Sequence, residues 1–171
     1  MKPLASPVRE LRTASALYAV ACAVAVVLVV VLDRASVVGA IVLTALGAVV
    51  FGVAIWVAAY GRFLRDALEA PAPDPPDAAR EEPSRTVART VLTNLPLAAV
   101  VVLMALLVPG VAGVLLGNAV CLGLMARGMV DWQRREGALL LREPRYRTQG
   151  PDGRTGRGFL DPVDFYRADL R

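Results

Sequence analysis

The chain has 171 residues, of which 56% are hydrophobic and 20% are charged, and its net charge is +4 at pH 7. The hydrophobic residues gather in long uncharged blocks with the charges between them, which is typical of an integral membrane protein and not of a soluble domain. The sequence has no His, and its two cysteines, Cys22 and Cys121, lie in separate apolar blocks. This excludes a zinc site and disfavours a disulfide, so we expect both thiols to pack as small apolar groups.

The basic residues are eighteen Arg and one Lys, in a chain rich in Ala, Val and Leu. We interpret this composition as the codon bias of a bacterial genome of high GC content and not as an arginine signature for phosphate binding. We therefore expect no nucleic-acid partner.

Three uncharged stretches follow one another along the chain, at 13–32, 35–61 and 90–126. The first two each predict one transmembrane helix, because about 20 helical residues cross a hydrocarbon core roughly 30 Å thick. Trp56 and Tyr60 are expected to anchor the end of the second span at the membrane surface. The third stretch is long enough for two short spans, and the turn-forming pair Pro109-Gly110 divides it near its middle.

The basic clusters fall on one side of these spans, whereas the opposite connections carry only Arg34, next to Asp33. The positive-inside rule then places both termini in the cytoplasm. The predicted fold class is an all-α integral membrane protein with four transmembrane helices arranged as two antiparallel hairpins, N-in and C-in. The predicted segments are an N-terminal segment at 1–13, spans at 14–32, 37–60, 90–108 and 111–130, outer turns at 33–36 and 109–110, a cytoplasmic linker at 61–89 and a cytoplasmic tail at 131–171.

Residues 1–32 also have the basic start and apolar run of a signal peptide. The run is long for a signal peptide and no clear A-x-A cleavage site follows it. A lipoprotein cleavage before Cys22 has Ala19 where a Leu is expected. We therefore expect the first span to be retained.

Small residues recur at four-residue steps in two of the predicted spans. The second span contains Ala40, Thr44, Ala48 and Gly52, and the fourth contains Gly113, Gly117 and Cys121. Each series forms a flat stripe on one helix face, which lets a neighbouring backbone approach closely. We expect the stripes to pack within the bundle of one chain, and a contact between two copies is the alternative.

Polar residues inside the predicted spans are few, and Asn94, Pro96 and Asn118 are the most informative. One hypothesis is that Asn118 and a kink at Pro96 line a substrate path. The simpler one, which we favour, is an interhelical hydrogen bond and a structural kink, with Thr93 or Asn94 bonding the carbonyl that Pro96 leaves free. No charged residue lies in a span core, which argues against an intramembrane proton relay.

The polar segments suggest connectors and docking elements. Residues 66–85 read as a solvated, partly extended linker, and the fourth helix is expected to continue to Glu136 and end at Gly137. Residues 138–142 are too short to span and should pack on the bundle or at the membrane surface. The glycine-rich stretch 148–158 lacks the P-loop pattern. Asp161-Pro162 predicts a helix start before the aromatic pair Phe165 and Tyr166, which makes the tail a candidate docking element.

No catalytic, cofactor-binding or metal-binding constellation emerges from the sequence. We expect a non-enzymatic accessory, assembly or scaffold subunit of the plasma membrane, in contact with the lipid bilayer and with a protein partner through the linker or tail. The alternative is a small homo-oligomeric transporter or channel with Gly113 and Gly117 between copies. A lipid-modifying enzyme is disfavoured, because the candidates Asp66, Asp131 and Glu136 have no paired spacing.

Overall fold

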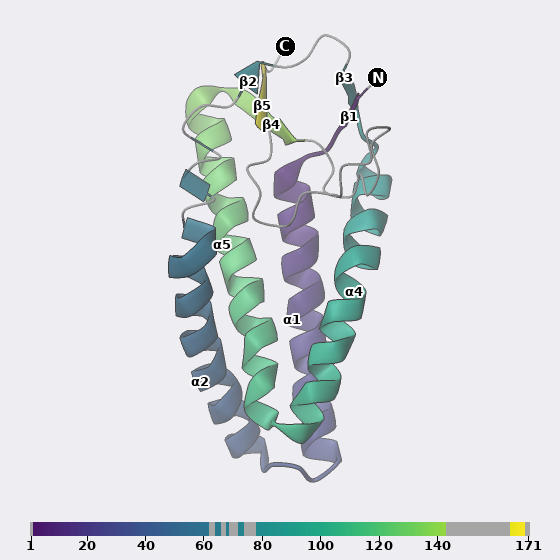
Figure 1. The fold of residues 1–171 in the computed structure, drawn as a ribbon, viewed down its shortest axis with the longest axis vertical. Coiled ribbons are helices and arrows are strands. Elements are labelled where there is room, and N and C mark those ends of the chain that lie inside the picture. The colour runs from purple at the N-terminus through teal and green to yellow at the C-terminus, as the bar shows by residue number, and fades with distance from the viewer. Residues whose placement is uncertain are drawn as a thin grey trace.

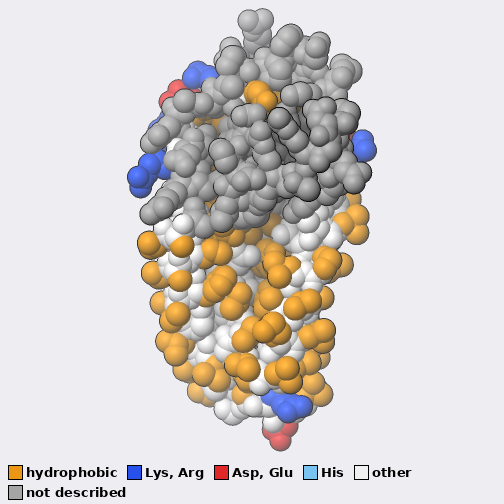
Figure 2. All heavy atoms as spheres, in the orientation of Figure 1, with side chains coloured by type: hydrophobic (Ala, Val, Ile, Leu, Met, Phe, Trp, Pro, Cys, Tyr) orange, Lys and Arg blue, Asp and Glu red, His pale blue; other side chains and the backbone are white. Residues whose placement is uncertain are grey.

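The computed structural model describes residues 2–61, 64–65, 68, 72–73, 78–142 and 165–169. Within these residues, four helices are long and apolar enough to cross a membrane, as predicted. They are α1 (Pro7–Val31), α2 (Val37–Ile55), α4 (Pro83–Leu107) and α5 (Ala112–Glu136), and they form one elongated bundle (Figure 1). Hydrophobic side chains cover the helical surface visible in Figure 2, and many large Val and Leu side chains are exposed. An exposed apolar surface of this extent is typical of helices that face lipid or another apolar partner.

The two ends of the bundle differ. At one end, which we call the turn end, a short connection joins α1 to α2, and a 3-10 turn, η2 (Pro109–Val111), joins α4 to α5 (Figure 1). The predicted Pro109-Gly110 turn is thus confirmed. The other end, which we call the terminal end, carries the strands. One sheet pairs β1 (Lys2–Leu4) with β3 (Ala78–Arg80). The other has the strand order β2-β5-β4 and consists of β2 (Ala72–Pro73), β5 (Phe165–Asp169) and β4 (Ala138–Arg142).

Local sequence explains where the helices begin and end. Ser6 caps α1 by accepting a hydrogen bond from the backbone N–H of Arg9, and Pro7 occupies a first-turn position that needs no N–H. Ser36 caps α2 in the same way, through the N–H of Gly39. Gly137, with φ of 62°, ends α5 in the left-handed conformation, which confirms the predicted C-cap.

The polar segments are more ordered than predicted. Helix α1 begins at Pro7, inside the predicted N-terminal segment, and α4 begins at Pro83, inside the predicted linker. Residues 138–142 do pack on the bundle, but as strand β4. The prediction of a helix at Phe165 and Tyr166 is wrong, because both belong to β5, which pairs antiparallel with β4. Asp161 and Pro162, the glycine-rich stretch 148–158 and most of 66–77 lie outside the described residues.

The helices pack in an order that the predicted hairpins do not describe. Helix α5 lies along both α1 and α2, and α1 lies along α4, whereas helices consecutive in the chain contact each other little. Helices α2 and α4 both contact η2 at the turn end and diverge toward the terminal end, on either side of α5 and α1 (Figure 1). The bundle is therefore closed at one end and open between α2 and α4 at the other.

The small-residue stripes of α2 and α5 face each other. A Cβ placed on Gly113 would lie 2.5 Å from the carbonyl oxygen of Thr44, and one on Gly117 would lie 2.8 Å from that of Ala48. The Sγ of Cys121 donates to the carbonyl of Gly52 over 3.4 Å. This confirms packing within one chain. It also removes the basis for a transporter with Gly113 and Gly117 between copies, because both glycines are buried inside the bundle.

Candidate functional site

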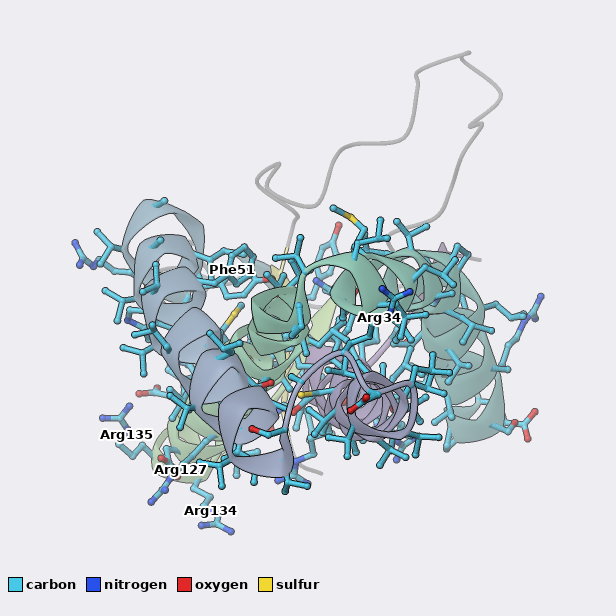
Figure 3. The ribbon with its side chains drawn as sticks, turned by 90° about the horizontal axis from the view of Figure 1, so that it is seen from below. Arg34, Phe51, Arg127, Arg134 and Arg135 are labelled. Atoms are coloured by element: carbon cyan, nitrogen blue, oxygen red, sulfur yellow. The ribbon has the colours of Figure 1, made fainter. Side chains whose placement is uncertain are left out.

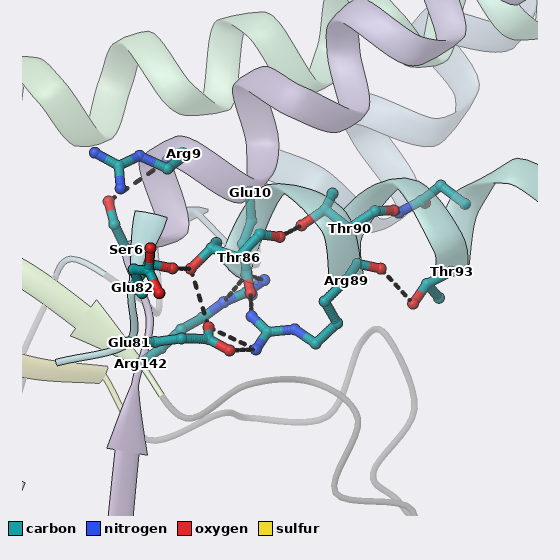
Figure 4. Close-up of polar contacts among 11 residues, drawn as sticks. Ser6, Arg9, Glu10, Glu81, Glu82, Thr86, Arg89, Thr90, Thr93 and Arg142 are labelled. Atoms are coloured by element: carbon teal, nitrogen blue, oxygen red, sulfur yellow. Dashed lines mark hydrogen bonds and ion pairs between the residues drawn. The ribbon is translucent and has the colours of Figure 1, made fainter. Parts of the chain in front are cut away.

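A buried group of charged side chains lies at the terminal end of the bundle (Figure 4). Glu10, in the first turn of α1, accepts hydrogen bonds from two arginines. Arg89 Nη2 lies 2.5 Å from Glu10 Oε1, and Arg142 Nε lies 2.7 Å from Glu10 Oε2, with Arg142 Nη2 bonding the same oxygen. Arg89 also binds Glu81 through Nη1, at 2.6 Å from Oε2. We call Glu10, Glu81, Arg89 and Arg142 the ion cluster.

The ion cluster joins four segments that are distant in the sequence. Glu10 comes from α1, Arg89 from α4, Arg142 from β4, and Glu81 from the residues just before α4. The backbone holds these segments in register, because Arg142 exchanges hydrogen bonds with Ala5 and the N–H of Glu81 donates to the carbonyl of Leu4 over 2.8 Å. The arrangement therefore fixes the strands of the terminal end to the helices.

Burial makes these pairs energetically important. The side chain of Arg142 is 1% exposed and that of Glu10 is 7% exposed. Charges removed from water in this way must be paired, and removing one partner of a buried pair typically costs about 3–5 kcal/mol. Two guanidinium groups face two carboxylates, so the ion cluster has no excess formal charge.

One donor of the ion cluster is not used. Arg142 Nη1 is buried and has no hydrogen-bond partner among the described residues. A buried unsatisfied donor costs stability and therefore calls for an explanation, of which a partner outside the chain is one. Because Arg142 lines a cavity, this donor is a candidate contact for a ligand.

The cavity has a volume of about 440 Å³ and runs between α2 and α4, over α1 and α5. This is within the range of about 300–1,000 Å³ usual for small-molecule sites. Its charged residues lie at the terminal end, beside Leu11 and Ala14, and its deeper part is apolar apart from Asn118. The polar lining comprises Glu10, Tyr18, Tyr60, Thr90, Thr93, Asn94, Asn118 and Arg142, and the apolar lining includes Phe51, Leu97, Val101 and Leu115. Phe51 projects from α2 toward the side of α4 (Figure 3). We call this cavity the lateral groove.

Two hydrogen bonds between helices stiffen the walls of the lateral groove. The hydroxyl of Tyr18 donates to Asn94 Oδ1 over 3.0 Å, and that of Tyr60 donates to Asn118 Oδ1 over 2.7 Å. Tyr60 belongs to a π-helical turn, η1 (Trp56–Tyr60), that follows α2. The prediction that Tyr60 anchors the span at the membrane surface is wrong, because its side chain is buried against α5.

Asn94 and Asn118, whose role the sequence did not decide, have definite hydrogen-bond partners. Asn118 makes the expected interhelical bond, and both Asn94 and Asn118 line the lateral groove. Pro96 lies inside α4. Pro96 leaves the carbonyl of Leu92 without its helical donor, and neither Thr93 nor Asn94 bonds it. Thr93 instead donates to the carbonyl of Arg89 over 2.9 Å, and Asn94 donates to that of Thr90 over 2.8 Å.

Two of the three disfavoured enzyme candidates lie within the described residues, and both are on α5. Asp131 is exposed on α5, and Glu136 makes an exposed ion pair with Arg167 at 3.4 Å. Asp66 lies outside the described residues. Within the part of the chain that the structure describes, no three His, Cys, Asp or Glu residues are placed to hold a metal ion. Cys22 and Cys121 are free and buried, as expected.

Sequence reasoning missed the ion cluster. Glu10, Arg89 and Glu81 fall in segments predicted to be solvated, and nothing in residues 138–142 marks Arg142 as buried. A signal was available for Glu10, because it continues the four-residue series of Ala14, Tyr18 and Cys22 on the buried face of α1.

Comparison with known proteins identifies no relative: no protein-family model, curated protein or solved structure matches the chain. The function is therefore argued from the site itself.

Proposed function

We propose that the chain is a multi-pass protein of the plasma membrane with both termini in the cytoplasm, and that it acts as a non-enzymatic accessory or scaffold subunit. The observation that carries this proposal is the ion cluster, which joins β4 and the residues just before α4 to helices α1 and α4 at the terminal end. A scaffold needs such a fixed surface, because a partner that binds ordered segments does not have to order them first.

The distribution of arginines supports the orientation. Arg134 and Arg135 project outward from the end of α5, whereas Arg34 lies at the turn end (Figure 3). With the terminal end in the cytoplasm, the outward arginines meet the anionic lipid of the inner leaflet. The surface of the terminal end, with the linker and the C-terminal tail, then faces cytoplasmic partners.

Single-cysteine labelling tests the orientation. Cys22 and Cys121 are replaced by Ala, and then Arg34→Cys and Arg134→Cys are compared in intact cells with a membrane-impermeant maleimide. Both arginines are exposed, so each new thiol is accessible from its own side. We expect labelling of Arg34→Cys in intact cells and of Arg134→Cys only after the membrane is opened. The reverse pattern would overturn the orientation.

The accessory role is tested by crosslinking in native membranes. The intact chain is crosslinked, purified in detergent and compared with a chain that lacks 143–171, the part of the tail after β4. We expect a stoichiometric protein partner with the intact chain and loss of this partner with the shortened one. Recovery of the intact chain without any stoichiometric partner would contradict the accessory role and leave the orientation standing.

A further inference from the structure

We propose that the lateral groove binds one acyl chain of a glycerophospholipid from the cytoplasmic leaflet, with an oxygen of the lipid's glycerol-phosphate region accepting a hydrogen bond from Arg142 Nη1. This inference rests on the proposed insertion and orientation in the membrane, but it is independent of the accessory role.

The dimensions of the lateral groove fit one leaflet. On α4 its lining extends from Thr90 to Val101, which is about 16 Å at 1.5 Å per helical residue. Half of a hydrocarbon core is roughly 15 Å thick. A lipid whose head lies beside Arg142 would therefore extend its acyl chain along Leu97 and Val101 toward the middle of the bilayer.

The polarity of the lateral groove fits the same ligand. Its charged and hydroxyl-bearing residues lie toward the terminal end, where a headgroup would be, and Leu97, Val101 and Leu115 lie deeper. Leu97 is 56% exposed, so the wall at this point is open to the surrounding lipid. A lipid can then enter sideways from the bilayer.

Charge distinguishes a lipid from a free anion. Because the ion cluster pairs two guanidinium groups with two carboxylates, it offers an anion a hydrogen bond but no excess formal charge. A free phosphate would have to be held by that bond alone. A lipid is held by its apolar chain as well and needs the bond only to fix its head.

The test uses the full chain in detergent, titrated with dipalmitoylphosphatidylglycerol and followed by native mass spectrometry. In the blocking variant, Leu97→Trp and Val101→Trp together fill the lateral groove. In the matched control, Val100→Trp and Leu103→Trp change exposed α4 residues that do not line it. We expect one tightly bound lipid in the wild type and the control, and about tenfold weaker binding in the blocking variant.

A second variant tests the donor. Glu10→Leu combined with Arg142→Met removes the buried pair as a unit, which proteins tolerate far better than the loss of one partner. We expect this variant to bind the lipid about tenfold more weakly, since it lacks a charge-assisted hydrogen bond. Its thermal unfolding in detergent shows that the bundle is intact.

Several results would overturn the proposal. Equal lipid binding by the blocking variant and its control would show that the lipid lies elsewhere on the bundle. Wild-type affinity in the Glu10→Leu, Arg142→Met variant would remove Arg142 from the site. Saturable binding of inorganic phosphate would identify a free-anion site, and a photoreactive side chain at position 97 that crosslinks protein instead of lipid in native membranes would identify a docking groove.

Discussion

The α2–α5 contact and the ion cluster hold the same bundle by opposite means. Where Gly113 and Gly117 meet α2 there is no room for a side chain, because a Cβ on either would lie less than 3 Å from the α2 backbone. At the terminal end, long charged side chains bridge helices and strands that lie farther apart. Within lipid the hydrophobic effect does not draw helices together, so close packing must do so. In the orientation proposed above, the terminal end lies at the membrane surface, where paired charges cost less free energy than in the hydrocarbon core.

The most damaging change should be the loss of one charge from the ion cluster. Glu10→Leu leaves Arg142 buried without its carboxylate, and we expect the free energy of unfolding to fall by about 3–5 kcal/mol. Unfolding by a denaturing detergent, with circular dichroism as the readout, measures this difference.

Two controls sharpen this prediction. Glu136→Ala breaks the ion pair with Arg167, whose partners are 45% and 43% exposed, and should change stability by about 0–1 kcal/mol. Adding Arg142→Met to Glu10→Leu should recover most of the lost stability, because no unpaired charge then remains buried. If Glu10→Leu and Glu136→Ala were equally mild, the ion cluster would not fix the terminal end.

A smaller loss is expected where the α2–α5 backbones meet. Gly113→Ala places a Cβ 2.5 Å from the backbone of Thr44 and Ala48, which cannot move aside as a side chain would. The helices must separate, and overpacking of this kind costs about 1–3 kcal/mol. The same unfolding assay measures the loss.

Gly123→Ala is the matched control on the same helix. Its Cβ would meet only the hydroxyl of Ser15 at 3.5 Å, an ordinary contact. Replacing Gly by Ala inside a helix then stabilises by about 0.5–1 kcal/mol, because the unfolded chain loses freedom. A loss of stability in both variants would indicate that α5 tolerates no added methyl group, whatever the distance to α2.

The sequence predicts the two faces that form the α2–α5 contact, because each is periodic, but it does not predict that they meet each other. The stripes that contain Thr44, Ala48, Gly113 and Gly117 are visible as four-residue steps, and helical geometry makes each a single face. The sequence also locates the apolar helices and the turn at Pro109-Gly110, since length and hydrophobicity determine both.

The ion cluster was not predicted, because its members share no local pattern. Glu10, Glu81, Arg89 and Arg142 meet only after β1, β3 and β4 have brought distant segments together. A charged residue taken by itself is expected to be exposed to solvent. Its side chain is buried only when it is paired, and here the partners are far apart in the sequence. The lateral groove was missed for a related reason, since the divergence of α2 and α4 results from packing around α5 and α1.

The smallest effect is expected between these two regions, where Tyr60 bonds Asn118. Tyr60→Phe removes a hydroxyl and keeps the ring, and hydrogen bonds between membrane helices contribute on average about 0.6 kcal/mol. A double-mutant cycle with Asn118→Leu isolates the pair from other effects of either change. Tyr18→Phe, which loses a 3.0 Å bond to Asn94, is the matched control and should give a similar value. A Tyr60–Asn118 coupling as large as the loss in Glu10→Leu would contradict this order, and would mean that η1 is held by this one bond and not by the packing of α2 on α5.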